Sequence, residues 1–221
     1  MNGSPVAGES GFRLGGMAPT IDSLPRVIDN PSIGTDGRPV PELRAELRRI
    51  PSLLNAWSVL WCYGQNILIL AAAVHINHIA TWLIAFLLMG RMHAQFASLM
   101  HEAAHRLLFK HRGANDWVGN WLLGFPVITS TPAYRRVHMA HHREEFGPDE
   151  PDIPLYANYP ITAESFRRKL VRDATGQTGI KLFRNQLRGF RSPDVRVRRT
   201  LLKMALVQVI VIAAFFAAGH P

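Results

Sequence analysis

Cysteine is nearly absent from the sequence, which contains Cys62 alone among 221 residues. One thiol can supply neither a disulfide framework nor a cysteine-based metal site. The first 40 residues also lack the apolar core of a secretion signal, because Gly, Pro and Ser alternate with charged residues there. This composition predicts a disordered tail over residues 1–40.

Charged side chains are absent from residues 50–90. As one helix these 41 residues would measure about 61 Å, which is twice the ~30 Å hydrocarbon core of a bilayer. We therefore expect two crossings, near residues 53–74 and 79–100, with the polar cluster His75–His78 as the turn. Arg91 lies inside the second span, where a charge is costly. We expect the turn to fall slightly earlier, or Arg91 to reach the interface or face other helices.

Three further segments complete the helical prediction. Residues 201–219 form a third apolar run, with Lys203 as its only charge. Residues 41–49 predict a short amphipathic helix that leads into the first span. Residues 115–130 are apolar but broken by glycines and Pro126, and are too short to cross, so an interfacial or re-entrant segment is expected. The predicted fold class is an all-α integral membrane protein: a transmembrane hairpin, at least one further span and a cytoplasmic helical cap.

The positive charge of the chain orients the hairpin. The formal net charge is +9, and nearly all basic residues lie before the hairpin or between His101 and Arg199. The positive-inside rule assigns both regions to the cytoplasm and the turn to the opposite side. Beside membrane spans, basic clusters favour anionic lipid over nucleic acid as the partner.

Histidines form two clusters at helical spacing. The segment His101–His105 reads His-Glu-Ala-Ala-His, which satisfies both the zinc pattern H-E-x-x-H and the looser H-x-x-x-H. Thr131–Pro132 supplies a helix N-cap with proline at the first helical position, and Gly147–Pro148 supplies a stop, so a helix of about four turns is expected between them. This helix carries His138, His141 and His142. On a helix these three imidazoles can face one side, as can those of His101 and His105.

The number of imidazoles bears on the choice of metal. A catalytic zinc takes three protein ligands, and a protease would need an Asp or Glu ligand from a buried span, which the apolar runs lack. Five imidazoles suit a site with more than one metal, and imidazole binds iron as well as zinc. The bilayer setting favours iron, because unactivated C–H bonds of lipids need an iron-bound oxidant. A membrane zinc protease that uses Glu102 as general base stays open as an alternative.

At these residues the chain resembles the membrane fatty-acid desaturase superfamily, which is recognised by three histidine boxes. His101-x-x-x-His105 is similar to the first box, and His138-x-x-His141-His142 is similar to the second. The acidic segment Pro148–Asp152 resembles a Pro-Asp segment that recurs in the family. The resemblance covers residues 55–220 in order and topology.

The resemblance implies a di-iron centre on the cytoplasmic side, with dioxygen as co-substrate and a ferredoxin- or cytochrome-type electron donor. Its implied iron ligands are His101, His105, His138, His141 and His142. Glu102, Asp149 and Asp152 are expected to accept hydrogen bonds from the ligands. Relatives desaturate fatty acyl chains, while others hydroxylate or ketolate carotenoids, sterols or alkanes. An acyl-lipid or acyl-CoA desaturase is thus expected, with a hydroxylase or ketolase as the alternative.

One part of the family pattern is missing. The third histidine box and the span before it do not occur in the sequence. We therefore expect residues 41–221 to form a desaturase-like membrane domain that is incomplete at its C-terminus and inactive alone.

Overall fold

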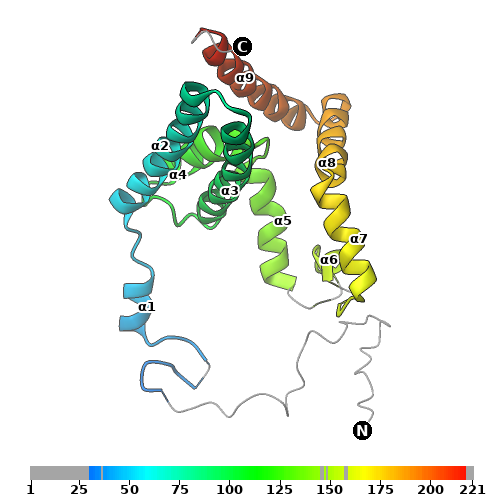
Figure 1. Ribbon diagram of the computed structural model, residues 1–221. Helices are drawn as coiled ribbons and strands as arrows, with labels where there is room; N and C mark the ends of the chain where they lie inside the picture. The colour runs from blue at the N-terminus through cyan, green and yellow to red at the C-terminus, as the bar shows by residue number, and fades with distance from the viewer. Residues whose placement is uncertain (1–29, 36, 145–146, 148, 157–158, 218–221) are drawn as a thin grey trace. The chain divides into compact units, whose positions relative to one another are not determined.

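The computed structural model describes residues 30–217 except 36, 145–146, 148 and 157–158 (Figure 1). Most of the predicted tail and Pro148 therefore lie outside the described residues. The described helices are α1 (Pro41–Leu47), α2 (Ser52–Ile76), α3 (Ile79–Ala104), α4 (Arg112–Val118), the π-helix η2 (Gly119–Gly124), the 3-10 helix η3 (Phe125–Val127), α5 (Thr131–Glu144), α6 (Ile153–Tyr156), α7 (Ala163–Ala174), α8 (Gln177–Arg188), the 3-10 helix η4 (Gly189–Arg191) and α9 (Val195–Ala217). Among the described residues the only β pairing is an isolated bridge, so the predicted all-α class is confirmed.

The chain divides into two compact units. The membrane unit consists of residues 50–136 and 186–221, and the second unit of residues 1–49 and 137–185. Both boundaries near the middle of the chain fall inside a continuous helix, the first within α5 and the second within α8.

The predicted hairpin is α2 followed by α3, which pack against each other in the membrane unit (Figure 1). Asn77 ends α2 in the left-handed conformation, with φ of 47°. His78 is the N-cap of α3: its Nδ1 accepts a hydrogen bond from the Ala80 N–H at 3.2 Å, while the Thr81 hydroxyl accepts one from the His78 N–H. The turn therefore lies where the polar cluster predicts it.

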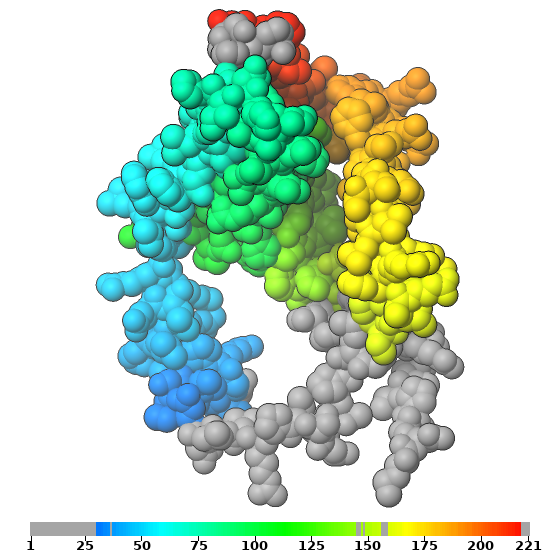
Figure 2. All heavy atoms as spheres, viewed as in Figure 1, coloured from blue at the N-terminus to red at the C-terminus, as the bar shows by residue number. Residues whose placement is uncertain are grey.

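The outer surfaces of α2 and α3 are apolar and uncovered. Leu53 is 89% exposed and Phe86 is 78% exposed, and a bilayer is the environment that accommodates such a surface. Figure 2 shows atoms of both helices, in cyan and blue-green, at the surface of the molecule. Three helices, including α9, are long and apolar enough to cross it. The turn is not displaced by Arg91, which instead points toward α2 and donates to Gln65 Oε1 at 3.4 Å.

The segment predicted to be broken by glycines, residues 115–130, is helical as far as Val127. It runs from α4 through η2 to η3 and changes helix type rather than ending. Gly119 permits a close approach, because a Cβ there would lie 2.7 Å from Ala103 Cβ, and a Cβ at Gly124 would lie 3.1 Å from two carbonyl oxygens. Gly119 therefore serves packing against α3, Gly124 permits a close approach of backbone carbonyls, and neither glycine ends the helical run.

The third span, α9, packs against this same segment. Gln208 donates to the Phe125 carbonyl at 2.9 Å and to the Pro126 carbonyl at 3.2 Å. Leu201 and Met204 are buried against Phe125. These contacts attach α9 to the region that follows the hairpin.

Candidate metal centre

The first predicted histidine pair lies at the end of α3. His101 is in its last turn and His105 is its C-cap, and their ring centroids are 4.6 Å apart. Glu102 Oε1 lies 3.2 Å from His101 Nδ1, so this carboxylate contacts the ligand candidate next to it. Both side chains are partly exposed, at 37% for His101 and 48% for Glu102.

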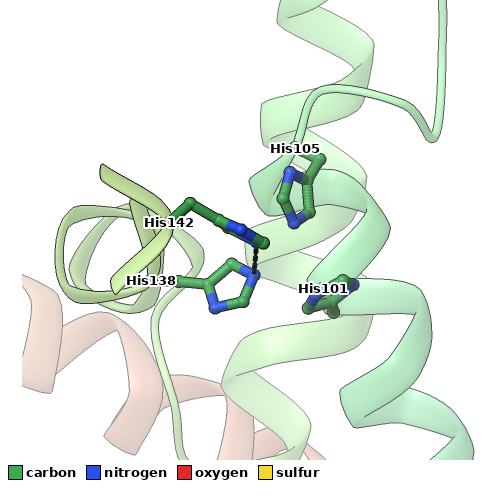
Figure 3. Close-up of side chains that lie close together, drawn as sticks. All are labelled: His101, His105, His138 and His142. Carbon is green, nitrogen blue, oxygen red and sulfur yellow. Dashed lines mark hydrogen bonds between the residues drawn. The ribbon is translucent and has the colours of Figure 1, made fainter. Parts of the chain in front are cut away.

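The second predicted pair lies on α5. The Nε2 atoms of His138 and His142 are 3.1 Å apart, and the ring centroids are 4.5 Å apart (Figure 3). Two imidazole nitrogens at this distance either share one proton or bind a common ion. Figure 3 also draws His101 and His105, the pair carried by α3.

The fifth histidine, His141, has carboxylate partners. Its Nδ1 lies 2.5 Å from Glu150 Oε1 and 3.6 Å from Asp152 Oδ2. Glu150 is the buried member, with 1% of its side chain exposed. The three residues offer ligand atoms within 4.8 Å of one another. Asp149 is exposed, and no contact between it and a histidine is found in the described part of the chain.

Glu150 was missed as a site residue by sequence reasoning. The acidic segment contains three carboxylates, and their spacing does not reveal which one turns inward. Burial identifies Glu150, because a carboxylate this enclosed needs a hydrogen-bond donor, and His141 provides it.

Arg135, near the start of α5, forms hydrogen bonds with the end of α3. Its guanidinium donates to the Ala104 carbonyl at 2.7 Å and to the Ala103 carbonyl at 2.8 Å, and it pairs with Asp116 at 2.5 Å. Asn115 also donates to the Ala103 carbonyl, at 2.8 Å. These donors satisfy carbonyls that a helix C-terminus otherwise leaves without partners.

The same cluster shifts the pKa of Asp116. Partial burial disfavours the charged carboxylate, but hydrogen bonds from Arg135 and Asn115, together with the Arg135 charge, outweigh it and hold the pKa of Asp116 below its ordinary value. The ion pair therefore stays formed at neutral pH.

Thr131 differs from its predicted role. Helix α5 begins at Thr131 itself, and its buried hydroxyl has no hydrogen-bond partner among the described residues. Its backbone N–H instead donates to Asn120 Oδ1, at 3.2 Å. The predicted helix is confirmed, whereas the predicted cap is wrong.

The register of α5 follows from its anchor. Tyr134, next to Arg135, has its ring centroid 6.3 Å from that of His101. His138 and His142 come four and eight residues after Tyr134 in the same continuous helix. Residues at this spacing share one face, so the face of α5 that begins at Tyr134 also carries the second histidine pair.

The donor set fits iron. Imidazole nitrogens supported by carboxylates are suitable ligands for this metal. In the described residues Glu102 contacts His101, and Glu150 and Asp152 contact His141.

Comparisons with known proteins add to the geometry. A family model described as fatty acid desaturase matches residues 77–221. A curated relative, the Delta(5) fatty acid desaturase fat-4 of Caenorhabditis elegans, is 34% identical over 106 residues, which cover 45% of this chain and 23% of that protein. The chain thus spans about a quarter of the relative's length. No solved structure matches the chain.

Proposed function

Since the chain belongs to the fatty acid desaturase family, we propose that it takes part in the O2-dependent desaturation of a fatty acyl chain, carried as an acyl-lipid or acyl-CoA. The observation that supports this most is the pair of imidazoles, His101 and His105, at the end of α3. The ring of Tyr134 lies beside His101, and the same face of α5 carries the second pair, His138 and His142. A hydroxylase or ketolase acting on a carotenoid, sterol or alkane would use the same residues and is the alternative.

The proposed metal ligands are the five predicted histidines, His101, His105, His138, His141 and His142. Two iron ions bound there would supply the oxidising power needed to remove hydrogen from an unactivated C–H bond. Forming one double bond with one dioxygen also consumes two electrons and two protons and releases two waters. A ferredoxin- or cytochrome-type donor is proposed to deliver the electrons.

The chain's own residues orient the ligands. Glu150, as a buried carboxylate, accepts a hydrogen bond from the Nδ1–H of His141, which would leave the Nε2 lone pair of that ring available to hold a metal. Glu102 does the same for His101. Arg135 fixes where α5 starts relative to the end of α3, and the continuous helix carries His138 and His142 from that point.

The proposed side of the centre is the cytoplasm. The basic residues on both sides of the hairpin support this orientation. Single cysteines at Glu42, Ile76 and Glu164, in a Cys62→Ala background, would be labelled in sealed membranes. We expect Glu42→Cys and Glu164→Cys to react from one side and Ile76→Cys from the other. Reaction of all three from the same side would contradict the orientation.

Metal binding and chemistry are tested together. The chain, alone and within its longest reading frame, would be expressed in membranes with iron and a reductase system. We expect iron to copurify and to fall strongly in His101→Gln and His138→Gln. The matched control is His75→Gln, which removes an imidazole from the hairpin turn and should leave iron unchanged.

Mass spectrometry of the lipids distinguishes the reactions. A product two hydrogens lighter than its substrate supports desaturation, whereas addition of oxygen supports the hydroxylase or ketolase. Equal iron content in the three histidine variants and the parent chain would contradict the proposed ligands.

A further inference from the structure

Two amphipathic helices of the described chain present apolar faces to their surroundings. On α7, Phe166 is 54% exposed, Leu170 is 53% exposed and Val171 is 55% exposed. On α8 the side chains of Ile180, Phe183 and Leu187 are spaced three, four and seven residues apart and so share one face, whereas Leu182 lies on another face. All three are about half exposed, at 49% to 54%.

Basic residues flank these apolar faces. Residues 163–188 contain seven Lys or Arg against two acidic residues, and α8 contains no acidic residue. Lys181, Arg184 and Arg188 lie on one face of α8 by their spacing of three and four residues, directly beside the apolar face. Of the two acidic residues, Asp173 is already bonded to Thr178 and Arg172. Helix α8 is therefore cationic along the edge of its apolar face.

The C-terminal end of α8 contacts the membrane unit near the start of the span α9. Gln186 donates to the Ile128 carbonyl at 2.8 Å within the membrane unit. Gly189 lies so close to α9 that a Cβ there would be 2.8 Å from Leu201 Cδ1. Only a short connection separates α8 from α9, and α9 begins with Arg196, Arg198 and Arg199 before its apolar part. Chain connectivity therefore keeps the C-terminal end of α8, from Gln186 onward, close to the start of this span.

We propose that α7 and α8 lie on the membrane surface, with their apolar faces in the acyl-chain boundary and the basic residues beside these faces on anionic phospholipid headgroups. Phosphate groups of anionic lipids match the cationic edge, and the lipid tails cover the apolar faces. Docking of an acidic electron-donor protein would use the charges alone and would leave Phe166, Leu170 and Phe183 in water. The bilayer accounts for both features, and this argument depends on the membrane spans and not on the proposed chemistry.

The test measures the depth of each helix face in the full chain. In a Cys62→Ala background, single cysteines would carry a fluorescent label in nanodiscs of phosphatidylcholine, with or without phosphatidylglycerol. Leu170→Cys and Phe183→Cys report the apolar faces. Arg168→Cys and Thr178→Cys report the opposite sides of the same helices, so each helix carries its own control.

We expect acyl-brominated lipids to quench the labels at positions 170 and 183 at least about twofold more than those at 168 and 178, and more so with phosphatidylglycerol. Replacing Lys181 and Arg184 by Gln should remove the effect of phosphatidylglycerol. Equal quenching on the two faces, with full access of aqueous iodide, would overturn the proposal. Protection of these labels only after an acidic redox protein is added would also overturn it, in favour of protein docking.

Discussion

Replacing Arg135 by Ala should destabilise the membrane unit strongly. The guanidinium makes three charge-assisted contacts, and a hydrogen bond involving a charged group contributes about 1.5–3 kcal/mol to stability. The full sum is not expected, because Asn115 still donates to the Ala103 carbonyl and the Asp116 side chain is 39% exposed to solvent. We therefore expect a loss of about 3 kcal/mol in the free energy of unfolding.

The loss should appear as a lower thermal midpoint. For a chain of this length, 1 kcal/mol corresponds to about 2–4 °C, so Arg135→Ala should melt about 6–12 °C earlier. Arg135→Lys should lose about half as much, because an ammonium group is a point charge and cannot replace a planar fork that reaches three acceptors.

The lone cysteine provides the assay. Cys62 is 3% exposed, so a thiol-reactive dye reports its release on heating in detergent micelles. Arg136→Ala is the matched control, since Arg136 is the exposed neighbour of Arg135 in α5. If Arg135→Ala and Arg136→Ala melt within about 2 °C of each other, the inference that Arg135 fastens α5 to α3 is refuted.

Three further variants test the surroundings of the centre. Glu150→Gln should weaken iron binding about tenfold in a metal titration, because its histidine partner loses a carboxylate acceptor, whereas Asp149→Asn should bind like the parent. Gly119→Ala should cost about 1–3 kcal/mol by thermal melting, since its Cβ would clash with an alanine of α3, and Gly179→Ala, in open space on α8, should cost nothing. Because the pKa of Asp116 is lowered in the folded chain, its stabilisation is full above an unfolded pKa of about 3.9 and is lost as pH falls through the folded value. The thermal midpoint of Asp116→Asn should thus depend less on pH in this acidic range, and an unchanged dependence would contradict the pKa assignment.

The hairpin could be predicted because its signals are local. A long run without charge requires two crossings, and only one polar cluster lies near its middle, at His75–His78. The structure turns there, with α3 beginning at Ile79. Helix α3 continues to Ala104, past the predicted end at residue 100, and this additional polar turn carries His101.

The segment around Gly119 and Gly124 could not be predicted in the same way. Glycine is unfavourable in a helix interior, so both residues indicated a break. The structure keeps the helix, since α3 approaches so closely that a side chain at Gly119 would clash with Ala103. This close approach is a tertiary contact between two helices, so the residues next to Gly119 in the sequence do not predict it.

The site was predictable in its residue types but not in its supports. Helical spacing groups His101 with His105, and His138 with His141 and His142. His101 lies beside His105 and His138 beside His142, whereas Nδ1 of His141 lies against Glu150. The choice of Glu150 over Asp149 depends on how the chain folds back after α5. The role of Arg135 depends on carbonyls 31 and 32 residues away, which no spacing rule relates to it.

The length of α3 has a consequence for the depth of the first histidine pair. Its 26 residues measure about 39 Å, about 9 Å more than a ~30 Å hydrocarbon core. With the polar turn at Asn77 held at one interface, the last turns of α3 emerge at the other, and they carry His101. Membranes that differ by a few Å in thickness would therefore place these ring nitrogens at different levels relative to the headgroups. The hydration of the imidazoles then varies with bilayer thickness, so lipid composition alone can change their environment while the sequence stays constant.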